Sequence, residues 1–572
     1  MPLTTRRAFR ALTSGLLAAG LAVVALAPAA AAPRPDEPGT GTRPASSTTV
    51  TPGTGPLSVS VLVPIVVPPT TTGLITADDL ERYTGSFGTL TRQLDAVAGT
   101  GATLAVDPMV FASIRVLGSS APVSAQSWLA RLESLPNETF TLAYADADLV
   151  TAARTGTLDA LQPTGFGFAL DSGDFSPVVT PPPTETPTPA PTATTDPGQA
   201  PPFPTTDELL AWATTLPSIA WPADESVASG DLAPLAAAGY ADVIVSSELA
   251  GSTAPLVALE GIQGIVSDAP LSAALRESVS ALSESDRAAA LAGLDAALAS
   301  EFSAAPGRGI VLTLGRGWAG AMTGIGETLA HLQATETAQL VGLSEILATT
   351  PGSATLAEGT ADADREQVFT SLADDAAKEA TFSSVVVDPA PLLDSRGLER
   401  IALSGNGWQQ AADAWGEAVN AFHTRSAEIL SSVQIERGSD VVLLARNTDF
   451  RVAVSNTLPY AIKVLVGITP QSPILRVEGD EELIVEPEAT GSVRIPVEAV
   501  ANGDVIVQTT LHSPTGVPID AAFVRVTAQA EWEGIGTTVV VILLVLVFGA
   551  GIVRIVVKRR RARAADAEDA RD

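Results

Sequence analysis

The stretch SVSVLVPIVV at residues 58–67 is a nearly continuous run of apolar side chains, and it is the first of a series along the chain. Runs of this length, separated by alanine-rich helical or turn segments, are typical of parallel strands buried on both faces of a sheet. They predict an α/β fold over residues 58–430. The further runs stand at 102–107, 140–146, 217–221, 241–248, 262–268, 309–317 and 382–389.

The segments between these runs favour a barrel. ESDRAAALAGLDAALASEF at residues 284–302 has the helical pattern of a segment that covers a parallel sheet. ALEGIQGIVSD at 258–268 differs, because only Glu260 and Gly261 separate its two apolar runs, which indicates a hairpin. We therefore expect a distorted (β/α) barrel of about seven or eight strands.

The pattern after Ser431 changes to short runs of alternating apolar and polar residues, bounded by Gly, Asn, Pro or Asp. About seven such strands within about a hundred residues predict an immunoglobulin-like β-sandwich at 431–531. A domain of this kind just before the C-terminal apolar segment favours a spacer over a binding module. Tyr460 and His512 are placed at its loop tips and have the character of ordinary packing residues. The runs are at 441–446, 450–456, 462–470, 482–487, 491–499, 504–513 and 520–529.

The two ends of the chain predict export and membrane anchoring. Basic residues precede the apolar run LLAAGLAVVALA and an alanine-rich stretch, which predicts a signal peptide at 1–32. TTRRAFRAL also resembles a twin-arginine signal, and the ordinary secretory route stays open. The segment 534–553 has no charged residue, and about 20 apolar residues match the hydrocarbon core of a bilayer. We predict a transmembrane helix at 534–557, with Trp532 at the outer interface.

The tail at 558–572 begins with Lys558 and three arginines, so the positive-inside rule places it in the cytoplasm and the bulk of the chain outside. Two further stretches are rich in proline and threonine, which favours extended chain without a core. They predict a linker at 33–57 and a disordered insertion at 176–206 within the barrel domain. Both offer hydroxyl groups for O-glycosylation, whereas the Asn137 sequon is short enough to arise by chance.

Composition excludes several classes of function. A formal net charge of -31 argues against a nucleic-acid surface, which needs clustered Lys and Arg. The chain has no cysteine, which rules out disulfides, thiolate metal sites and cysteine nucleophiles. His331, His423 and His512 lie far apart, so the sequence shows no histidine-pair metal site. No phosphate-binding loop motif is present either, and we expect neither a metal nor a cofactor.

Acidic residues gather at the predicted carboxyl ends of the barrel strands, where α/β barrels build their active sites. Asp107 and Asp388 each precede proline, so we expect them to be mainly strand-end structural residues. Asp146, Asp148 and Glu248 lack that explanation and are the candidates for a catalytic or binding role. Each can equally be a turn or helix-capping residue. The remaining charged residues at these strand ends are Asp224, Glu225, Asp268 and Arg316.

The whole chain resembles an actinobacterial family of unknown function whose members are secreted and anchored by one membrane span. The resemblance rests on the WPAD-type segment at 220–248, Asp107, the YADAD stretch at 144–148 and the strands at 450–466. Members are often encoded near a MurJ-like lipid II flippase, which implies a cell-envelope role and brings no catalytic residues with it. The barrel is also distantly similar to polysaccharide deacetylases and related glycosidases, but it lacks the HxxxH motif of the metal-dependent deacetylases.

Three functions remain open from the sequence. The first is a cell-envelope binding or scaffolding protein with a catalytically silent barrel, which we favour. The second is a metal-independent glycan hydrolase that uses carboxylates at the strand ends; two such groups about 5 Å apart imply a retaining mechanism and about 6.5–9.5 Å an inverting one. The third is a partner protein of an envelope-synthesis complex. Cell-wall glycan, envelope-synthesis proteins and the membrane are the expected partners, and nucleic acid is not.

Overall fold

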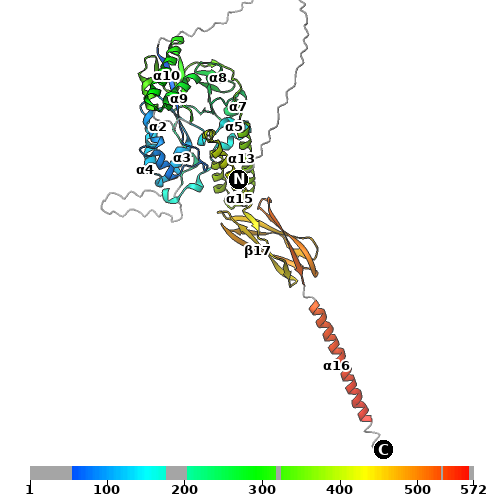
Figure 1. Cartoon of the computed structure of the whole chain (residues 1–572). Coiled ribbons are helices and arrows are strands. Elements are labelled where there is room, and N and C mark those ends of the chain that lie inside the picture. Colours follow the sequence, from blue (N-terminus) through cyan, green and yellow to red (C-terminus); the bar gives the residue numbers. More distant parts are fainter. Residues whose placement is uncertain (1–54, 176–202, 317–323, 530–532, 566–572) are drawn as a thin grey trace, which may run out of the picture. The chain divides into compact units, whose positions relative to one another are not determined.

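The computed structural model describes residues 55–175, 203–316, 324–529 and 533–565 (Figure 1). The expected signal peptide at 1–32, nearly all of the linker at 33–57 and most of the insertion at 176–206 lie outside these residues. The described chain forms a curled sheet with helices on both faces, a group of three long helices, a domain of antiparallel sheets and one C-terminal apolar helix.

The curled sheet is built around β1 (Leu57–Ile65), which pairs in parallel with β8 (Gly309–Thr313) on one side and with β2 (Thr103–Val106) on the other. Eight of the nine residues of β1 are buried, which explains why its sequence is apolar on both faces. The other strands of this sheet are β3 (Thr139–Thr141), β4 (Ile219–Ala220), β5 (Asp242–Ser246), β6 (Leu256–Ala258), β7 (Gln263–Ser267), β9 (Ala338–Leu340) and β10 (Gly352–Ser353).

The sheet curls without the full closure expected of a barrel. Its main path runs β10-β6-β7-β8-β1-β2-β3, and a branch leaves β7 through β5 to β4, so β3 ends the main path and β4 ends the branch without pairing to each other. The Thr215 N–H donates a hydrogen bond of 3.3 Å to the Thr139 carbonyl across that gap. Since β4 has only two residues, it offers too little edge to complete the ladder. The structure is therefore a curled half-barrel, and a closed barrel is not confirmed.

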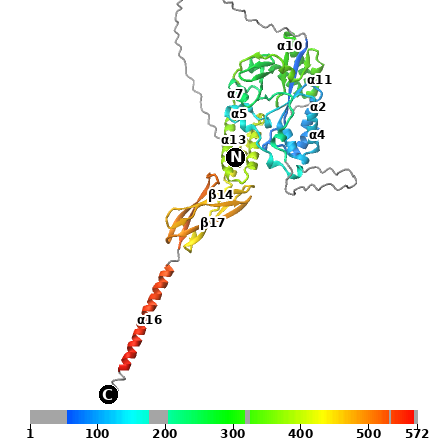
Figure 2. The ribbon, with the colours of Figure 1, turned by 180° about the vertical axis from the view of Figure 1, so that it is seen from behind.

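The hairpin expected at 258–268 is confirmed, because β6 and β7 pair antiparallel while the neighbouring strands are parallel. Helices α2, α3 and α4 lie along one side of the curled sheet, and α5 and α7 lie along the other (Figures 1 and 2). The helices of this region are α1 (Ala77–Thr84), α2 (Thr89–Val97), α3 (Pro108–Val116), α4 (Val123–Ser134), α5 (Leu149–Thr155), α6 (Thr206–Leu210), α7 (Ser229–Ala237), α8 (Ser247–Ala250), α9 (Ala269–Ser280), α10 (Glu284–Ala304), α11 (Ile325–Ala334) and α12 (Leu343–Leu347).

Three long helices follow the sheet: α13 (Ala363–Phe382), α14 (Ala390–Leu403) and α15 (Ala412–Leu430). A buried ion pair between Glu379 and Arg396, 2.8 Å apart, joins α13 to α14. Ser426 of α15 donates to Glu379 at 2.6 Å and accepts from Arg396 at 2.7 Å. All three helices therefore share one satisfied polar centre.

The run at 382–389, expected as a strand of the barrel, is not one. Its first valine ends a 3₁₀ turn at Ser383–Val385, and Val386 forms a β-bridge with Ile462 of the antiparallel domain. Three valines in a row satisfy the strand pattern, but the available sheet edge belongs to another domain. Asp388 consequently lies away from the curled sheet.

The antiparallel domain contains two sheets, which we call the two-sheet domain. One sheet has the order β11-β13-β17-β15, and the other β12-β19-β18-β14-β16. Their inward residues share one apolar core, although an immunoglobulin-like topology is not confirmed. The strands are β11 (Val433–Ile435), β12 (Val441–Leu443), β13 (Asn447–Asn456), β14 (Ile462–Pro470), β15 (Leu475–Val477), β16 (Glu481–Val485), β17 (Ala489–Ala499), β18 (Gly503–His512) and β19 (Pro518–Ala528).

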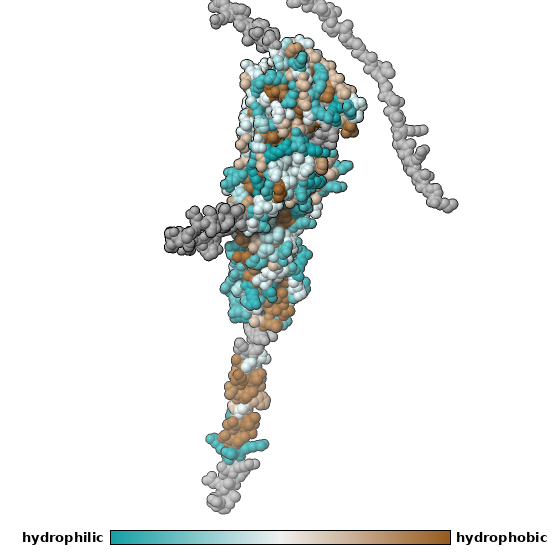
Figure 3. Space-filling model, turned by 90° about the vertical axis from the view of Figure 1, so that its left-hand side faces the viewer, coloured by the Kyte–Doolittle hydropathy of each residue, from teal (hydrophilic) through white to brown (hydrophobic). Residues whose placement is uncertain are grey.

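The last helix, α16 (Glu533–Ala565), is long and apolar enough over Thr537–Arg561 to span a membrane. Its side chains at 537–561 are exposed, and Figure 3 shows a brown apolar column that ends in teal hydrophilic atoms. The structure thus contains a candidate membrane anchor, as the sequence predicts. It does not show the side or orientation of the helix.

Candidate functional site

The YADAD stretch forms a tight turn after β3 that Asp107 holds in place. Ala145 and Asp146 both have positive φ, 56° and 47°, a conformation that is costly for residues with a side chain. Asp107 Oδ1 accepts hydrogen bonds of 2.9 Å from the backbone N–H of Ala145 and of Met109. The same carboxyl therefore caps α3 and fixes a turn that comes from the neighbouring strand.

Asp146 is paired with Arg316, which leaves the end of β8. Arg316 Nε lies 3.0 Å from Oδ2, and Nη2 lies 3.0 Å from Oδ1. The guanidinium also donates to the carbonyl oxygens of Trp221 and Pro222 and lies 4.8 Å from the centre of the Trp221 ring. Arg316 thus ties the ends of β3, β4 and β8 together around one buried carboxylate.

Asp148 is paired with a different arginine, from α13. Arg365 Nε lies 2.7 Å from Asp148 Oδ2, and both side chains are only 4% exposed. Asp148 Oδ1 caps α5 by accepting from the Thr151 N–H at 3.1 Å. Arg365 also donates to the carbonyl oxygens of Ser404 and Gly405. The pair consequently anchors the three-helix group to the curled sheet.

The loop after α14 completes this network. Asn406 Nδ2 donates to the Asp146 carbonyl at 2.9 Å, so the strained turn is held from a third element. At Gly405 a Cβ atom would come within 2.9 Å of the Ala145 carbonyl oxygen, and glycine is needed for this close approach. Such a strained turn persists only where several contacts hold it at once. Here the hydrogen bonds to Asp107 and from Asn406 do so.

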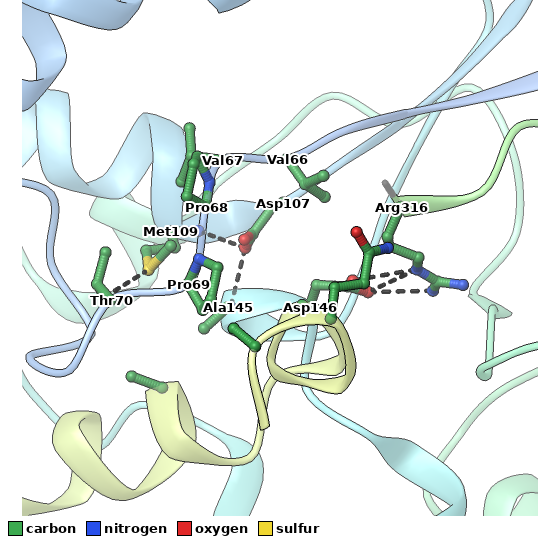
Figure 4. Close-up of a pocket in the computed structure, with 14 residues that line it drawn as sticks. Val66, Val67, Pro68, Pro69, Thr70, Asp107, Met109, Ala145, Asp146 and Arg316 are labelled. Atoms are coloured by element: carbon green, nitrogen blue, oxygen red, sulfur yellow. Dashed lines mark hydrogen bonds and ion pairs between the residues drawn. The ribbon is translucent and has the colours of Figure 1, made fainter. Parts of the chain in front are cut away.

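A cavity of about 280 Å³ opens beside this turn (Figure 4). Figure 4 shows the Val67–Pro69 segment at one side, the Asp146–Arg316 pair at the other, and Asp107 between them. The lining is largely apolar, with a small number of polar groups, which is the usual character of a small-molecule site. The polar groups are those of Thr70, Asp107, Asp146, Arg316 and Gln410, and the apolar wall includes Val66, Val67, Pro68, Pro69, Met109, Ala402 and Ala411.

Burial raises the pKa of the Asp107 carboxyl from 3.8 to about 8, even though the backbone hydrogen bonds act to lower it. Burial also raises the pKa of Asp146, and the charge of Arg316 opposes that effect. At neutral pH Asp107 is therefore mainly a neutral acid that can donate one hydrogen bond. A buried acid with a perturbed pKa in a cavity is a recognised mark of a functional site.

The other acids predicted at the strand ends do not join this cavity. Asp224 pairs with Arg276 at 2.9 Å and, with Glu225, lines a second cavity of about 190 Å³ at the ends of β5, β7 and β8. Asp268 caps α9. Glu248 is exposed on α8 and lines neither cavity, although the adjacent Leu249 lines the second one. Asp388 is exposed in the segment beside the two-sheet domain and accepts from the Ala390 N–H.

One arrangement resembles a Ser-His-Asp triad but has the wrong surroundings. His423 Nδ1 lies 2.7 Å from Asp375, and its Nε2 lies 3.4 Å from Ser371 Oγ. Burial acts to raise the pKa of Asp375, but hydrogen bonds from Lys378 and His423 leave it below its usual value. Ser371 donates to the Val368 carbonyl inside α13, where the helix uses each backbone N–H itself. The oxyanion donors that acyl transfer requires are thus not available beside Ser371.

His331 and the sequon have ordinary structural roles. His331 of α11 lies 2.9 Å from Asp295 of α10, which links two surface helices. Asn137 is buried and donates to three backbone carbonyl oxygens, so it is not accessible for glycosylation. Within the described ranges, no group of three or more His, Asp or Glu side chains is placed to hold a metal ion.

Sequence reasoning pointed to Asp146, Asp148 and Arg316 but missed their partners. Arg365 lies in a charged helical stretch that reads as a solvated surface, and Asn406 follows an unremarkable Ser-Gly pair. Neither residue type nor spacing signals a buried partner more than 200 residues away. The assignment of Asp107 as mainly structural also overlooked that a capping residue can line a cavity.

The fold is thus that of a multidomain protein with a curled parallel sheet, antiparallel sheets and one apolar C-terminal helix. The chain belongs to a family of unknown function, DUF6049, whose model matches residues 40–567. No curated protein matches the sequence.

Several solved structures show local likeness. The α-amylase AmyC from Thermotoga maritima is 11% identical with a TM-score of 0.35, over 65% of this chain and 97% of the amylase. An Escherichia coli α-2-macroglobulin fragment is 16% identical with a TM-score of 0.15, over 18% of this chain and 17% of the fragment. The PapD-like domain 7 of human CEP192 is 11% identical with a TM-score of 0.14, over 18% of this chain and 85% of that domain. These TM-scores are too low to carry an argument about function.

Proposed function

We propose that this protein is a membrane-anchored, extracytoplasmic binding or scaffolding protein of the cell envelope, and that its curled sheet is catalytically silent. The cavity beside Asp107 is its ligand site, and α16 holds it at the membrane. The family resemblance noted from the sequence, with its implied link to envelope synthesis, supports this setting.

The observation that carries the proposal is the pairing of two of the three candidate carboxylates with arginines. Asp146 and Asp148 each lie against a buried arginine, with contacts of 3.0 and 2.7 Å. Hydrolysis by a carboxylate pair needs one group free to attack or to activate water and another free to give a proton. A carboxylate that binds a planar guanidinium has its oxygens occupied by hydrogen bonds, so it has a structural role and is not free to attack a glycosidic bond.

The cavity chemistry favours a neutral, hydroxyl-rich ligand. Protonated Asp107 offers one donor and Gln410 offers donors and an acceptor, while the Thr70 hydroxyl, which donates to the Met109 sulfur at 3.7 Å, offers an acceptor. The apolar wall from Val67 to Pro69 can pack against the face of a sugar ring. A cell-wall glycan fragment fits these groups. The charges of Asp146 and Arg316 cancel, so the cavity wall that they form is close to neutral.

The test is binding of soluble cell-wall glycan fragments to the protein, measured by calorimetry. Gln410→Trp should fill the cavity mouth and abolish binding, because Gln410 is exposed and lines the cavity. Gln409→Trp is the matched control, since Gln409 is also exposed but does not line it. Equal binding by both variants would place the ligand site elsewhere.

A metal-independent glycan hydrolase is the second candidate, and the raised pKa of Asp107 favours it. An acid with a pKa of about 8 beside a second carboxylate, Asp146, is the pattern of a general acid and its partner. A hydrolysis screen with Asp107, Asp146, Asp148, Glu248 and Asp388 each changed to the amide separates the two candidates. Turnover by the wild type that is lost in Asp107→Asn, while folding is kept, would establish the hydrolase and overturn the binding role.

A further inference from the structure

Apolar side chains are exposed at one end of the two-sheet domain. Leu444 is 65% exposed, Val442 55%, Val500 46% and Ile506 45%. Figure 3 shows brown atoms gathered at an end of this domain. We call these four residues the tip patch. Monomeric proteins usually keep such side chains dispersed, and a group of them marks an interaction surface.

The strand registers place the tip patch at the end where the chain leaves the domain. Leu443, next to Leu444, pairs with Ala528, the last residue of β19, and accepts a hydrogen bond of 2.8 Å from the Gln529 N–H. Ala528 also pairs with Gly503 at the start of β18. Val500 precedes that start in the turn after β17, and the Ala499 N–H donates to the Arg446 carbonyl.

The distance from this end to the candidate span is short. Three residues lie between Gln529 and the start of α16 at Glu533, so the four Cα-to-Cα steps from Gln529 to Glu533 reach at most about 14 Å. Four more helical residues to Thr537 add about 6 Å. Gln529, which is hydrogen-bonded to Leu443 beside the tip patch, therefore stays within about 20 Å of the point where the span begins. The headgroup layer on each side of the hydrocarbon core is itself several ångströms thick.

The charged groups at this end are compatible with lipid headgroups. Arg446 and Arg476 are both 70% exposed, and they share one carboxylate, Glu498, at 3.1 and 3.4 Å. This group of three carries one net positive charge, and the exposed Asp504 at the start of β18 adds one negative charge at the same end. Arginine donors can meet lipid phosphates while neighbouring apolar side chains enter the interface.

We propose that the tip patch docks the two-sheet domain onto the bilayer surface, as a second membrane contact beside the span. This inference rests on the proposed anchoring role of α16. The contact would limit the freedom of the domain relative to the membrane. It would hold the two-sheet domain in one orientation relative to the bilayer, which attachment through the span alone does not do.

The test uses the full chain in vesicles of phosphatidylcholine and phosphatidylglycerol. Because the chain has no cysteine, one Leu444→Cys substitution places a single environment-sensitive fluorophore on the tip patch. Ile484→Cys is the matched control, since Ile484 is 55% exposed on β16. It pairs with Lys463, next to Ile462 and the bridge to Val386, at the opposite end of the domain. Quencher groups on the lipid chains measure how deep the fluorophore lies in the bilayer.

In vesicles the fluorescence emission of the label at position 444 should shift to shorter wavelength and should lose intensity when the lipids carry quenchers. The emission of the label at position 484 should not change. Flotation of the labelled protein with the vesicles measures separately whether α16 anchors the protein in the membrane. Flotation with an unquenched Leu444 label overturns the docking inference alone. Failure to float overturns the anchor and, with it, this inference. Equal quenching of both labels also overturns it, because the contact would not be confined to the tip patch.

Discussion

Asp107 serves two structural purposes with one oxygen, as a helix cap and as the support of the Ala145 turn. The same burial that makes these bonds strong makes ionisation costly, so the carboxyl is neutral at pH values where an exposed aspartate is charged. A protonated acid is therefore part of the native state. This links the stability of the site to pH.

Asp107→Asn should remove a pH dependence without removing the fold. The folded pKa of about 8 exceeds the usual 3.8, so the contribution of Asp107 to stability is fully present below pH 4 and is lost as pH rises through 8. Asparagine keeps the accepting oxygen and cannot ionise. The melting temperature of the wild type relative to the variant should therefore fall between pH 4 and 8 in fragment 55–529. A constant difference across this range would contradict the raised pKa.

Arg365→Leu should be strongly destabilising. It leaves Asp148 buried without its counter-charge, and breaking a buried pair in this way costs about 3–5 kcal/mol. Arg446→Leu is the control, because its pair with Glu498 is exposed and such pairs contribute about 0–1 kcal/mol. Urea denaturation of both variants measures the difference. Equal midpoints would show that Asp148 finds another partner.

At the scale of elements, the curled sheet is closed by side chains where strands are missing. β3 and β4 do not pair, and Arg316 connects them by binding Asp146 on one side and two carbonyl oxygens after β4 on the other. The insertion predicted at 176–206 lies in the sequence between these two strands. Its flanks are held, since Phe175 and Phe203 contact edge to face with ring centres 6.0 Å apart.

Deletion of residues 180–202 with a short glycine linker should leave the melting temperature within a few degrees. The flanking Phe175–Phe203 contact keeps the ends close, and halving a flexible loop changes its closure free energy by only about 0.6 kcal/mol. Deletion of 180–210 is the control, because it also removes α6 and the buried Leu209. Similar melting temperatures for both deletions would mean that α6 contributes little to the fold.

At the scale of the whole molecule, two large apolar cores and several buried ion pairs stabilise a chain that has no cysteine. The charged pairs lie where domains or layers meet, as Asp148–Arg365 does between sheet and helices. Burial of apolar side chains from strands and helices supplies most of the free energy of folding.

The orientation of the chain in the membrane is the prediction at this scale. Lys558 and the arginines after it follow the span directly, so a reporter fused after Asp572 should be cytosolic. Protease added to cells without their wall should digest the bulk and spare the tail. A digested tail with a protected bulk would reverse the orientation.

The sequence by itself determined most of the longer strands, the hairpin at β6–β7 and the candidate span, because each depends on a local pattern of apolar residues. The strands β9, β10, β11 and β15 have only two or three residues each, too few to show such a pattern. Tertiary structure alone decided that the valines before Asp388 pair with the two-sheet domain, since an apolar run does not specify which edge it meets. It also decided the site. Asp107, Asp146 and Arg316 come from three strand ends, and the burial that shifts the pKa of Asp107 exists only once these ends have met.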